Sequence, residues 1–339
     1  MTLIGMLHRR KSPYVLKRAY AYAAVSKMEN VEFFYFSFES VNFQEGKISG
    51  WVYDDREWKR KDMSFPDVVI NSCSPRNKRE YQITRKLKKQ CLFTSYSVGN
   101  KMSVHKKIVK AKQFSDFIIP SYYIKSGKEA LPHFSNNEKL VLKSLSGKHG
   151  KGVLFIECIE TQRFKVVVGS EVKIYSEDEL VLYIDDLIKE KKYMLQPFIE
   201  CKTKAGLTYD FRLHVQKNGQ GIWEINLIYP RISGSSRLVS NVSSGGYRGE
   251  LDSFLKDEFD EDYFNMKRLL EQFTLSFTKH FESLYSKEFD ELGIDVGLDS
   301  NKKLWIYEVN WRPGAKFREF EVAKKMIPYC LFLIRKNNS

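Results

Sequence analysis

The sequence predicts a protein of mixed helix and sheet, with a small α/β domain followed by two further α+β units. Strand-like and helix-like segments alternate over the first hundred residues, and a glycine-rich loop follows an apolar strand that ends at Lys143. A hairpin, a long amphipathic helix and two closing strands then follow Asp210. At 339 residues, the chain is also too long for one ordinary core.

The first unit is expected over residues 1–95. Apolar runs predict strands over residues 2–7, 31–38 and 67–71, and helical spacing predicts helices over 13–28 and 79–90. No GxGxxG follows any of these strands, so the unit is not an obvious dinucleotide site.

The second unit is expected over residues 96–199. Its pattern predicts helices over 101–114 and 177–190, a strand-like segment over 117–119, and strands over 140–143, 153–157, 163–168 and 193–199.

The third unit is expected over residues 200–339. Strands over 211–217 and 221–229 are joined by Asn218-Gly219, which is a hairpin signal. The polar, Gly/Ser-rich residues 231–249 predict a loop. Apolar residues between Met266 and Leu284 recur at helical steps, and residues 292–298 and 304–309 predict two closing strands.

Composition narrows the function classes. The formal net charge is +14, and residues 1–150 hold 28 Lys and Arg against 13 Asp and Glu. Such a basic half could meet nucleic acid or an acidic substrate, but no nucleic-acid motif accompanies it, so a solvated basic surface is favoured. No apolar stretch is long enough for a membrane span, and five widely spaced cysteines without a CxxC fit a reducing compartment. A mature cytoplasmic protein is therefore expected.

A phosphate-binding loop is one interpretation of residues 144–152. Lys143 ends a strand, and the loop after it contains Ser146, Gly147, Gly150 and Gly152. Glycines let several backbone N–H groups approach an anion, and a lysine adds a point charge. A plain flexible hairpin is the alternative, since no Walker motif is present.

A magnesium site is the interpretation of the two closing strands. Glu308 and Asn310 are two residues apart on one strand and share a face, with Asp295 on the neighbouring strand and Tyr307 facing the other way. Two carboxylates and an amide offer the hard oxygen ligands that Mg²⁺ takes. Edge charges facing water are the alternative.

Two arginines are candidates for contact with a phosphoryl group. Asp210 and Arg212 share a strand face and could pair with each other as an ordinary surface ion pair, or Arg212 could face phosphate or substrate. Arg231 stands at the start of the Gly/Ser-rich segment, where it could clamp a phosphoryl group.

The order of these motifs resembles the ATP-grasp superfamily. The series runs Asn100-Lys101, Lys143 with its glycine loop, Gln196-Pro-Phe-Ile-Glu200, Asp210-x-Arg212, Asp295, and Glu308-x-Asn310-x-x-Pro313-Gly314. More narrowly, it resembles the spore-coat-associated YheC/YheD-type branch. The resemblance implies an ATP-grasp fold, in which two α+β lobes clasp ATP behind a small α/β N-terminal domain.

The resemblance also implies roles for single residues. Lys101 and Lys143 would hold the nucleotide phosphates, and the backbone of Gln196, Pro197, Phe198 and Ile199 would read adenine, with Glu200 near the ribose. Arg231 would contact the transferred phosphoryl group, and Asp295, Glu308 and Asn310 would bind Mg²⁺, as two ions. Departures are Ser144 in place of proline, the Gln-Pro-Phe hinge, and Asp299 as a second candidate for the metal ligand near Asp295, although it has the pattern of a turn residue.

The implied activity is an ATP-dependent carboxylate–amine ligase that works through an acylphosphate. A small-molecule or peptide acid and an amine would be its substrates. Asn241, Gly245, Gly246 and Arg312 are candidates to hold the acid. A phosphotransferase on the same scaffold, and an ATP-binding coat-assembly protein without turnover, are the alternatives; the sequence does not indicate an oligomeric state.

Overall fold

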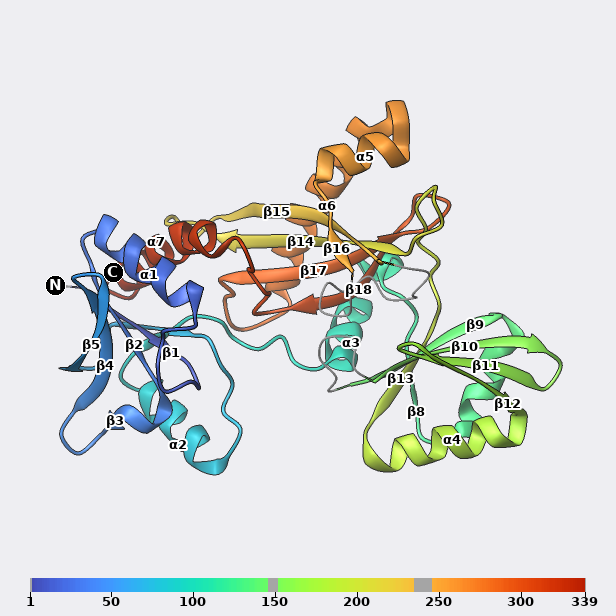
Figure 1. Cartoon of the computed structure of the whole chain (residues 1–339), viewed down its shortest axis with the longest axis horizontal. Coiled ribbons are helices and arrows are strands. Elements are labelled where there is room, and N and C mark those ends of the chain that lie inside the picture. Colours follow the sequence, from blue (N-terminus) through green and yellow to red (C-terminus); the bar gives the residue numbers. More distant parts are fainter. Residues whose placement is uncertain (1, 146–151, 235–245, 339) are drawn as a thin grey trace.

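Three β-sheets form the protein, each covered by helices (Figure 1). This computed structural model describes residues 2–145, 152–234 and 246–338. The first sheet has the strand order β3-β4-β2-β1-β6-β7, with β5 paired to β4. Its strands are β1 (Leu3–Leu7), β2 (Glu32–Phe36), β3 (Val41–Asn42), β4 (Lys47–Asp54), β5 (Glu57–Met63), β6 (Val68–Asn71) and β7 (Leu92–Phe93).

The first sheet is covered on both faces, which is why its central strands are apolar throughout. Strands β2, β1, β6 and β7 are parallel. Ile4 and Met6 point toward helix α1 (Lys17–Met28), whereas Leu3 and Leu7 point toward the face covered by α2 (Lys78–Leu87). The hairpin of β4 and β5 was not predicted, because its turn residues, Asp55 and Arg56, adopt positive φ without the usual glycine.

The middle sheet has the order β12-β11-β10-β9-β13-β8. Its elements are β8 (Tyr122–Ile124), β9 (Lys139–Ser144), β10 (Val153–Glu160), β11 (Arg163–Val168), β12 (Glu171–Ser176), α4 (Glu177–Glu190) and β13 (Tyr193–Pro197). Helix α4 starts with a capping box between Ser176 and Glu179 and covers one face of the sheet. Leu140 and Leu142 face that helix, so alternation turns Lys143 to the opposite face.

The last sheet is antiparallel, with the order β16-β15-β14-β17-β18. Its strands are β14 (Tyr209–Lys217), β15 (Trp223–Ile232), β16 (Tyr247–Arg248), β17 (Glu291–Leu298) and β18 (Leu304–Asn310). Phe211, Leu213 and Ile294 pack in a core with helices α3 (Lys101–Ala111), α5 (Leu251–Phe259) and α6 (Tyr263–Ser283). The alternate side chains of β14 therefore face away from this core.

Two local predictions were wrong, and one helix was missed. Residues 117–119 do not form a strand, because residues Ser115–Phe117 form a 3-10 turn. Arg231 and Ile232 belong to β15, and Tyr247 and Arg248 to β16, so the predicted loop 231–249 is shorter. The final helix, α7 (Glu319–Asn338), was missed, since Pro328 interrupts its pattern.

The three units share cores across their proposed boundaries. Helix α7 packs with α1 in the core of the first unit, and Val98, Val104 and Ile108 pack in the core of the last sheet. The divisions at residues 95 and 199 stay a proposal. None of the helices in the described ranges has the length and apolar character needed to cross a bilayer.

Candidate active site

One face of the last sheet carries a row of charged side chains. Asp210 on β14 is paired in register with Arg231 on β15, and Arg212 on β14 with Asp295 on β17. Asp295 is in turn the register partner of Glu308 on β18. Because register partners point to the same face, five charged residues from four strands lie together opposite the helical core.

The two arginines are each held by a carboxylate on the next strand. Arg231 donates from Nε and Nη2 to Asp210 at 2.6 and 2.7 Å, and its Nη2 lies 3.2 Å from Asp295 Oδ2. Arg212 donates from Nε to Asp295 Oδ1 and from Nη2 to Asp295 Oδ2 at 3.1 Å. The predicted pairing of Asp210 with Arg212 is therefore wrong, because cross-strand partners lie closer than residues two apart on one strand.

These pairs set the protonation of the row. Burial opposes ionisation of Asp295, but Arg212 and Arg231 together hold its pKa below the ordinary value. Burial also opposes the charge on Arg231, but Asp210 and Asp295 raise its pKa. Within the described residues, these pairs use Nε and Nη2 of each arginine and leave Nη1 to face a ligand.

Glu308 meets two lysines that come from other elements. Lys101 Nζ, at the first turn of α3, lies 3.9 Å from Glu308 Oε1. Lys143 approaches from the facing middle sheet, where burial and then the charge of Lys101 lower its pKa to about 8. Burial raises the pKa of Glu308, and Asp295 raises it further against the effect of Lys101. The negative charge of Glu308 is therefore disfavoured in this environment, and a further cation would stabilise it.

Tyr307 lies beside these groups, contrary to the predicted strand alternation. The register shifts between Asp295 and Val296, so Tyr307 is the extra residue of a β-bulge and lines the cavity together with Glu308. Its ring lies 5.6 Å from Lys143 Nζ, and its hydroxyl is 2.9 Å from Cys201 Sγ.

Two glycines on either side of Asp295 allow this arrangement. A Cβ at Gly297 would lie 2.1 Å from Tyr307 Oη, and a Cβ at Gly293 would lie 2.7 Å from Pro313 Cβ. Both contacts are too short for any side chain, which gives the Gly-Ile-Asp-Val-Gly sequence a physical reason. Asp299 accepts bonds from the backbone of Asn301 and Lys303 and is a turn residue.

The predicted adenine-reading strand divides between two cavities. Pro197, Phe198 and Ile199 line the larger cavity, whereas the Gln196 side chain is buried beside a smaller one and donates to Ser121 Oγ at 2.7 Å. The backbone N–H of Phe198 already donates a hydrogen bond to Lys139 O at 3.0 Å. Glu200 is exposed and does not line either cavity.

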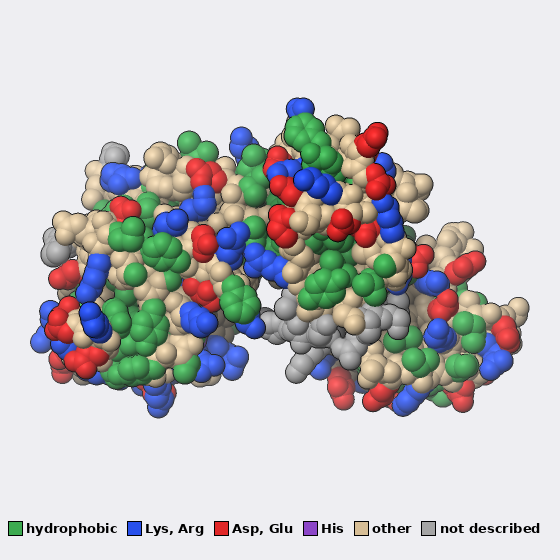
Figure 2. Space-filling model, turned by 45° about the horizontal axis from the view of Figure 1, so that its top comes forward, with side chains coloured by type: hydrophobic (Ala, Val, Ile, Leu, Met, Phe, Trp, Pro, Cys, Tyr) green, Lys and Arg blue, Asp and Glu red, His purple; other side chains and the backbone are tan. Residues whose placement is uncertain are grey.

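A cavity of about 1660 Å³ joins the three sheets at this point. Figure 2 shows the molecule hollowed between the first unit on the left and the middle unit on the right, with Lys and Arg side chains gathered near the centre. The described lining residues include three carboxylates, which belong to Asp210, Asp295 and Glu308. They also include ten cations: Arg9, Arg10, Arg76, Lys101, Lys143, Arg212, Arg231, Arg248, Arg312 and Lys316.

The remaining predicted residues are placed as follows. Asn310 and Arg312 line the cavity, and Gly152, with φ of +77°, closes the base of the β9–β10 hairpin by accepting from Ser144 N–H at 2.9 Å. Gly246 precedes β16 and does not line the cavity. Ser146, Gly147, Gly150, Asn241 and Gly245 lie outside the described residues.

Sequence reasoning missed two groups in the cavity. Tyr307 could not be found, because a bulge leaves no signal in the strand pattern. His8, Arg9 and Arg10 directly follow a predicted strand, and a basic triplet at a strand's carboxyl end could have marked them.

The fold and the arrangement of facing sheets around this cavity are those of an ATP-grasp protein. N5-carboxyaminoimidazole synthetase from Staphylococcus aureus, solved with ADP, has a TM-score of 0.59 at 9% identity, covering 97% of this chain and 77% of that chain. D-alanyl-alanine synthetase A from Vibrio cholerae has a TM-score of 0.58 at 12% identity, covering 99% of both.

The chain belongs to the YheC/D-like ATP-grasp family, whose model matches residues 90–333. It is 24% identical over 297 residues to the endospore coat-associated protein YheD of Bacillus subtilis, covering 83% of this chain and 64% of the relative. It is 22% identical over 268 residues to YheC of the same organism, covering 76% and 74%. The chain thus spans less than two thirds of the length of YheD.

Proposed function

We propose that the protein is an ATP- and Mg²⁺-dependent ligase that joins a carboxylate to an amine. The observation that carries the proposal is the charge around the cavity: four cations, Lys101, Lys143, Arg212 and Arg231, surround three carboxylates. Such a site favours a triphosphate with bound cations. The cavity is also larger than the about 300–1,000 Å³ of common ligand sites, which leaves room for a nucleotide and an acceptor.

Nucleotide binding is assigned to the facing surfaces of the middle and last sheets. Lys143 and Lys101 would contact the phosphates, with Arg231 and Arg212 offering their Nη1 groups to the transferred phosphoryl group. Since Phe198 N–H is occupied and Pro197 has none, Ile199 N–H is the hinge donor we assign to adenine. Glu200 is exposed and does not line the cavity, and its contact with the ribose remains a proposal from the resemblance.

Magnesium fits the residues on β17 and β18, with help from the nucleotide. The described residues contain no group of three His, Cys, Asp or Glu side chains that could hold a metal alone. Glu308 and Asn310 would supply protein ligands. Asp295 would supply a carboxylate whose two oxygens also contact Arg212 and Arg231. Phosphate oxygens would complete the coordination. Bound Mg²⁺, as two ions, would supply charge neutralisation during phosphoryl transfer.

The reaction follows from positioning and charge. An oxygen of the acid attacks the γ-phosphorus, the bond to the β-phosphate oxygen breaks, and ADP leaves. The amine nitrogen then attacks the acyl carbon, phosphate leaves, and the amine gives its proton to solvent. No protein nucleophile is needed, because the site orients both reactants and screens their charge.

A phosphate-release screen of acids crossed with amines tests the proposal, with Glu308→Gln as the inactive control. We expect ADP and phosphate only when an acid and an amine are both present. ADP formation with an acid alone and a stable phosphorylated product would instead identify a phosphotransferase. ATP binding without turnover across the screen would favour an assembly role, for which the names of the Bacillus relatives suggest the spore coat.

A further inference from the structure

The cavity continues past the proposed nucleotide site to the carboxyl edge of the first sheet. From β1 the chain crosses to β2 on one side and later returns to β6 on the other, so the strand order reverses between β1 and β6. Open parallel sheets bind ligands at the carboxyl ends of strands where this reversal occurs. His8 and Arg9 follow β1 at that position, and Ser74 and Arg76 follow β6.

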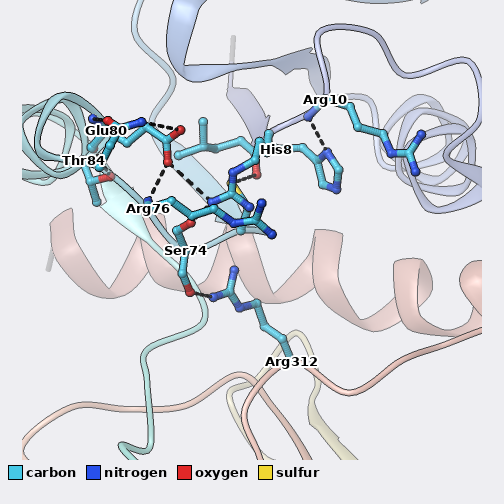
Figure 3. A network of polar contacts seen from close by, with 11 residues as sticks. His8, Arg10, Ser74, Arg76, Glu80, Thr84 and Arg312 are labelled. Carbon is cyan, nitrogen blue, oxygen red and sulfur yellow. Dashed lines mark hydrogen bonds and ion pairs between the residues drawn. The ribbon is translucent and has the colours of Figure 1, made fainter. Parts of the chain in front are cut away.

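Three arginines from distant parts of the chain meet there; Arg9, Arg76 and Arg312 are named the arginine cluster. Arg312 donates from Nη2 to Ser74 Oγ and from Nη1 to Asn71 O at 3.4 Å. Arg9 also donates to Ser74, at its carbonyl oxygen. Figure 3 shows Arg312 reaching Ser74 from one side, with Arg76 on the other. Ser74 therefore holds two guanidinium groups at one place.

The cluster has more positive charge than its surroundings neutralise. Glu80 is its acidic neighbour, 3.4 Å from Arg9 Nη2 and bonded to Arg76 N–H at 2.7 Å, and it does not line the cavity. Arg9 Nε is buried without a hydrogen-bond partner in the described part of the chain. Burial is the largest cause that lowers the pKa of His8 to about 4, and the positive charges of Arg10, Arg9 and Arg312 act in the same direction.

The distance to the proposed reaction centre is short. Strand β18 carries Glu308 and ends at Asn310, and Arg312 follows, so Arg312 stands four positions after Glu308 along the cavity wall. An extended chain rises about 3.3 Å per residue, which places the two within about 13 Å along one cavity wall. An acid whose two anionic groups are up to about 13 Å apart would reach both positions.

Resting on the proposed ligase function, we propose that the arginine cluster binds a second oxyanion, a phosphate or carboxylate, of the acid substrate. The substrate is then a polyanion: one carboxylate lies near Glu308 for activation, and the other anionic group lies between Arg9, Arg76 and Arg312. Among the described lining residues, cations exceed carboxylates by seven, and ATP with two bound Mg²⁺ ions carries too little net charge to offset that excess. Ser74 positions Arg9 and Arg312, and His8 lines the cavity beside them.

Orthophosphate titration followed by NMR of the histidine rings tests the site without turnover. The full chain is saturated with Mg²⁺ and a non-hydrolysable ATP analogue, so that the γ-phosphate position is filled and orthophosphate does not bind there, and His8 is assigned with His8→Asn. We expect phosphate to raise the His8 pKa from about 4 toward its ordinary value, because the oxyanion offsets the arginines. Arg9→Gln and Arg312→Gln should each weaken phosphate binding about tenfold or more, since charge-assisted bonds are lost.

The exposed Arg163, which pairs with Glu160 on the middle sheet, gives the matched control Arg163→Gln. A His8 pKa that ignores phosphate, or responds equally in Arg9→Gln and wild type, overturns the proposal. Among acids active in the phosphate-release screen, those with two anionic groups should have the lower KM, and Arg9→Gln should remove that difference. Turnover without this preference would support the ligase function and contradict the second oxyanion site. Phosphate binding at the cluster without turnover would support the oxyanion site and contradict the ligase function.

Discussion

Arg231 Nη2 lies 3.2 Å from Asp295 Oδ2, although the two residues stand on strands that are not neighbours. β14 runs between their strands and contributes Asp210 and Arg212. The result is a buried row of alternating charge across three strands, in which Asp295 is the residue shared by both arginines.

Removing that shared carboxylate should destabilise the protein. Asp295→Ala leaves Arg212 without its acidic partner in a buried position, and breaking such a pair costs about 3–5 kcal/mol. The free energy of unfolding from denaturant titration measures the loss. Asp186→Ala, which breaks an exposed pair with Lys189, is the control and should unfold at the wild-type midpoint. Equal midpoints for both variants would mean that the buried row does not stabilise the fold.

ATP affinity should decrease at alkaline pH. Burial and Lys101 lower the pKa of Lys143 to about 8, so its charge is present below that pH and is lost above it. We expect the Kd for ATP to rise about tenfold between pH 7 and pH 9, since one pKa unit corresponds to a tenfold change. Calorimetry of wild type and Lys143→Arg tests this, because arginine stays charged over the range. A parallel decline in both proteins would assign the effect to another group.

Gly297→Ala should disturb the nucleotide site through Tyr307. The new Cβ would lie 2.1 Å from Tyr307 Oη and 2.6 Å from Cys201 Sγ, so the tyrosine must move from beneath Lys143. Overpacking of this kind costs about 1–3 kcal/mol, and we expect a lower melting temperature and weaker ATP binding. Tyr307→Phe in the same chain should restore part of the stability. Gly314→Ala, where a Cβ meets open space, should leave the melting temperature unchanged.

Stability should also depend on pH through Asp290. Burial and the neighbouring Glu291 raise its pKa to about 7, while Ser95 donates to both carboxylate oxygens. The native state therefore keeps a proton that the unfolded chain loses near its ordinary pKa of about 4. Stability from this group is highest below about pH 4 and decreases as pH rises toward 7. Asp290→Asn should flatten the melting-temperature profile between pH 5 and 7.5; an unchanged slope would contradict the assignment.

Much of the site was predictable because its chemistry lies on regular strands. Alternation placed Glu308 and Asn310 on one face, and the strand before the glycine loop placed Lys143 in the cavity. The partner of Arg212 was not predictable, because the register between β14 and β17 depends on packing between residues far apart in the chain, and Asp295 is 83 positions from Arg212. Tyr307 was missed for the same reason: a bulge is a property of two strands together.

The arginine cluster lay beyond sequence reasoning for a different reason. Arg9, Ser74 and Arg312 come from three segments that no local period connects. Helix α7 was missed as well, although it brings the end of the chain onto α1. Only the packing of α7 shows that the first and last units share a core.

That shared core determines which part of the molecule can move. Arg18 lies 3.7 Å from Glu291, Ser95 bonds to Asp290, and Gln216 bonds to the backbone of α7, so polar contacts as well as the shared core join the first and last units into one frame. The middle sheet joins this frame through two connections, near residues 119–121 and 198–208 (Figure 1). We expect the middle sheet and α4 to move relative to this frame and to carry Lys143 with them. Arg9 and Arg312 belong to the frame, so the proposed oxyanion site between them should keep its geometry. Under the proposed ligase function, the acid would dock before the nucleotide, and closure over ATP would commit the bound acid to reaction.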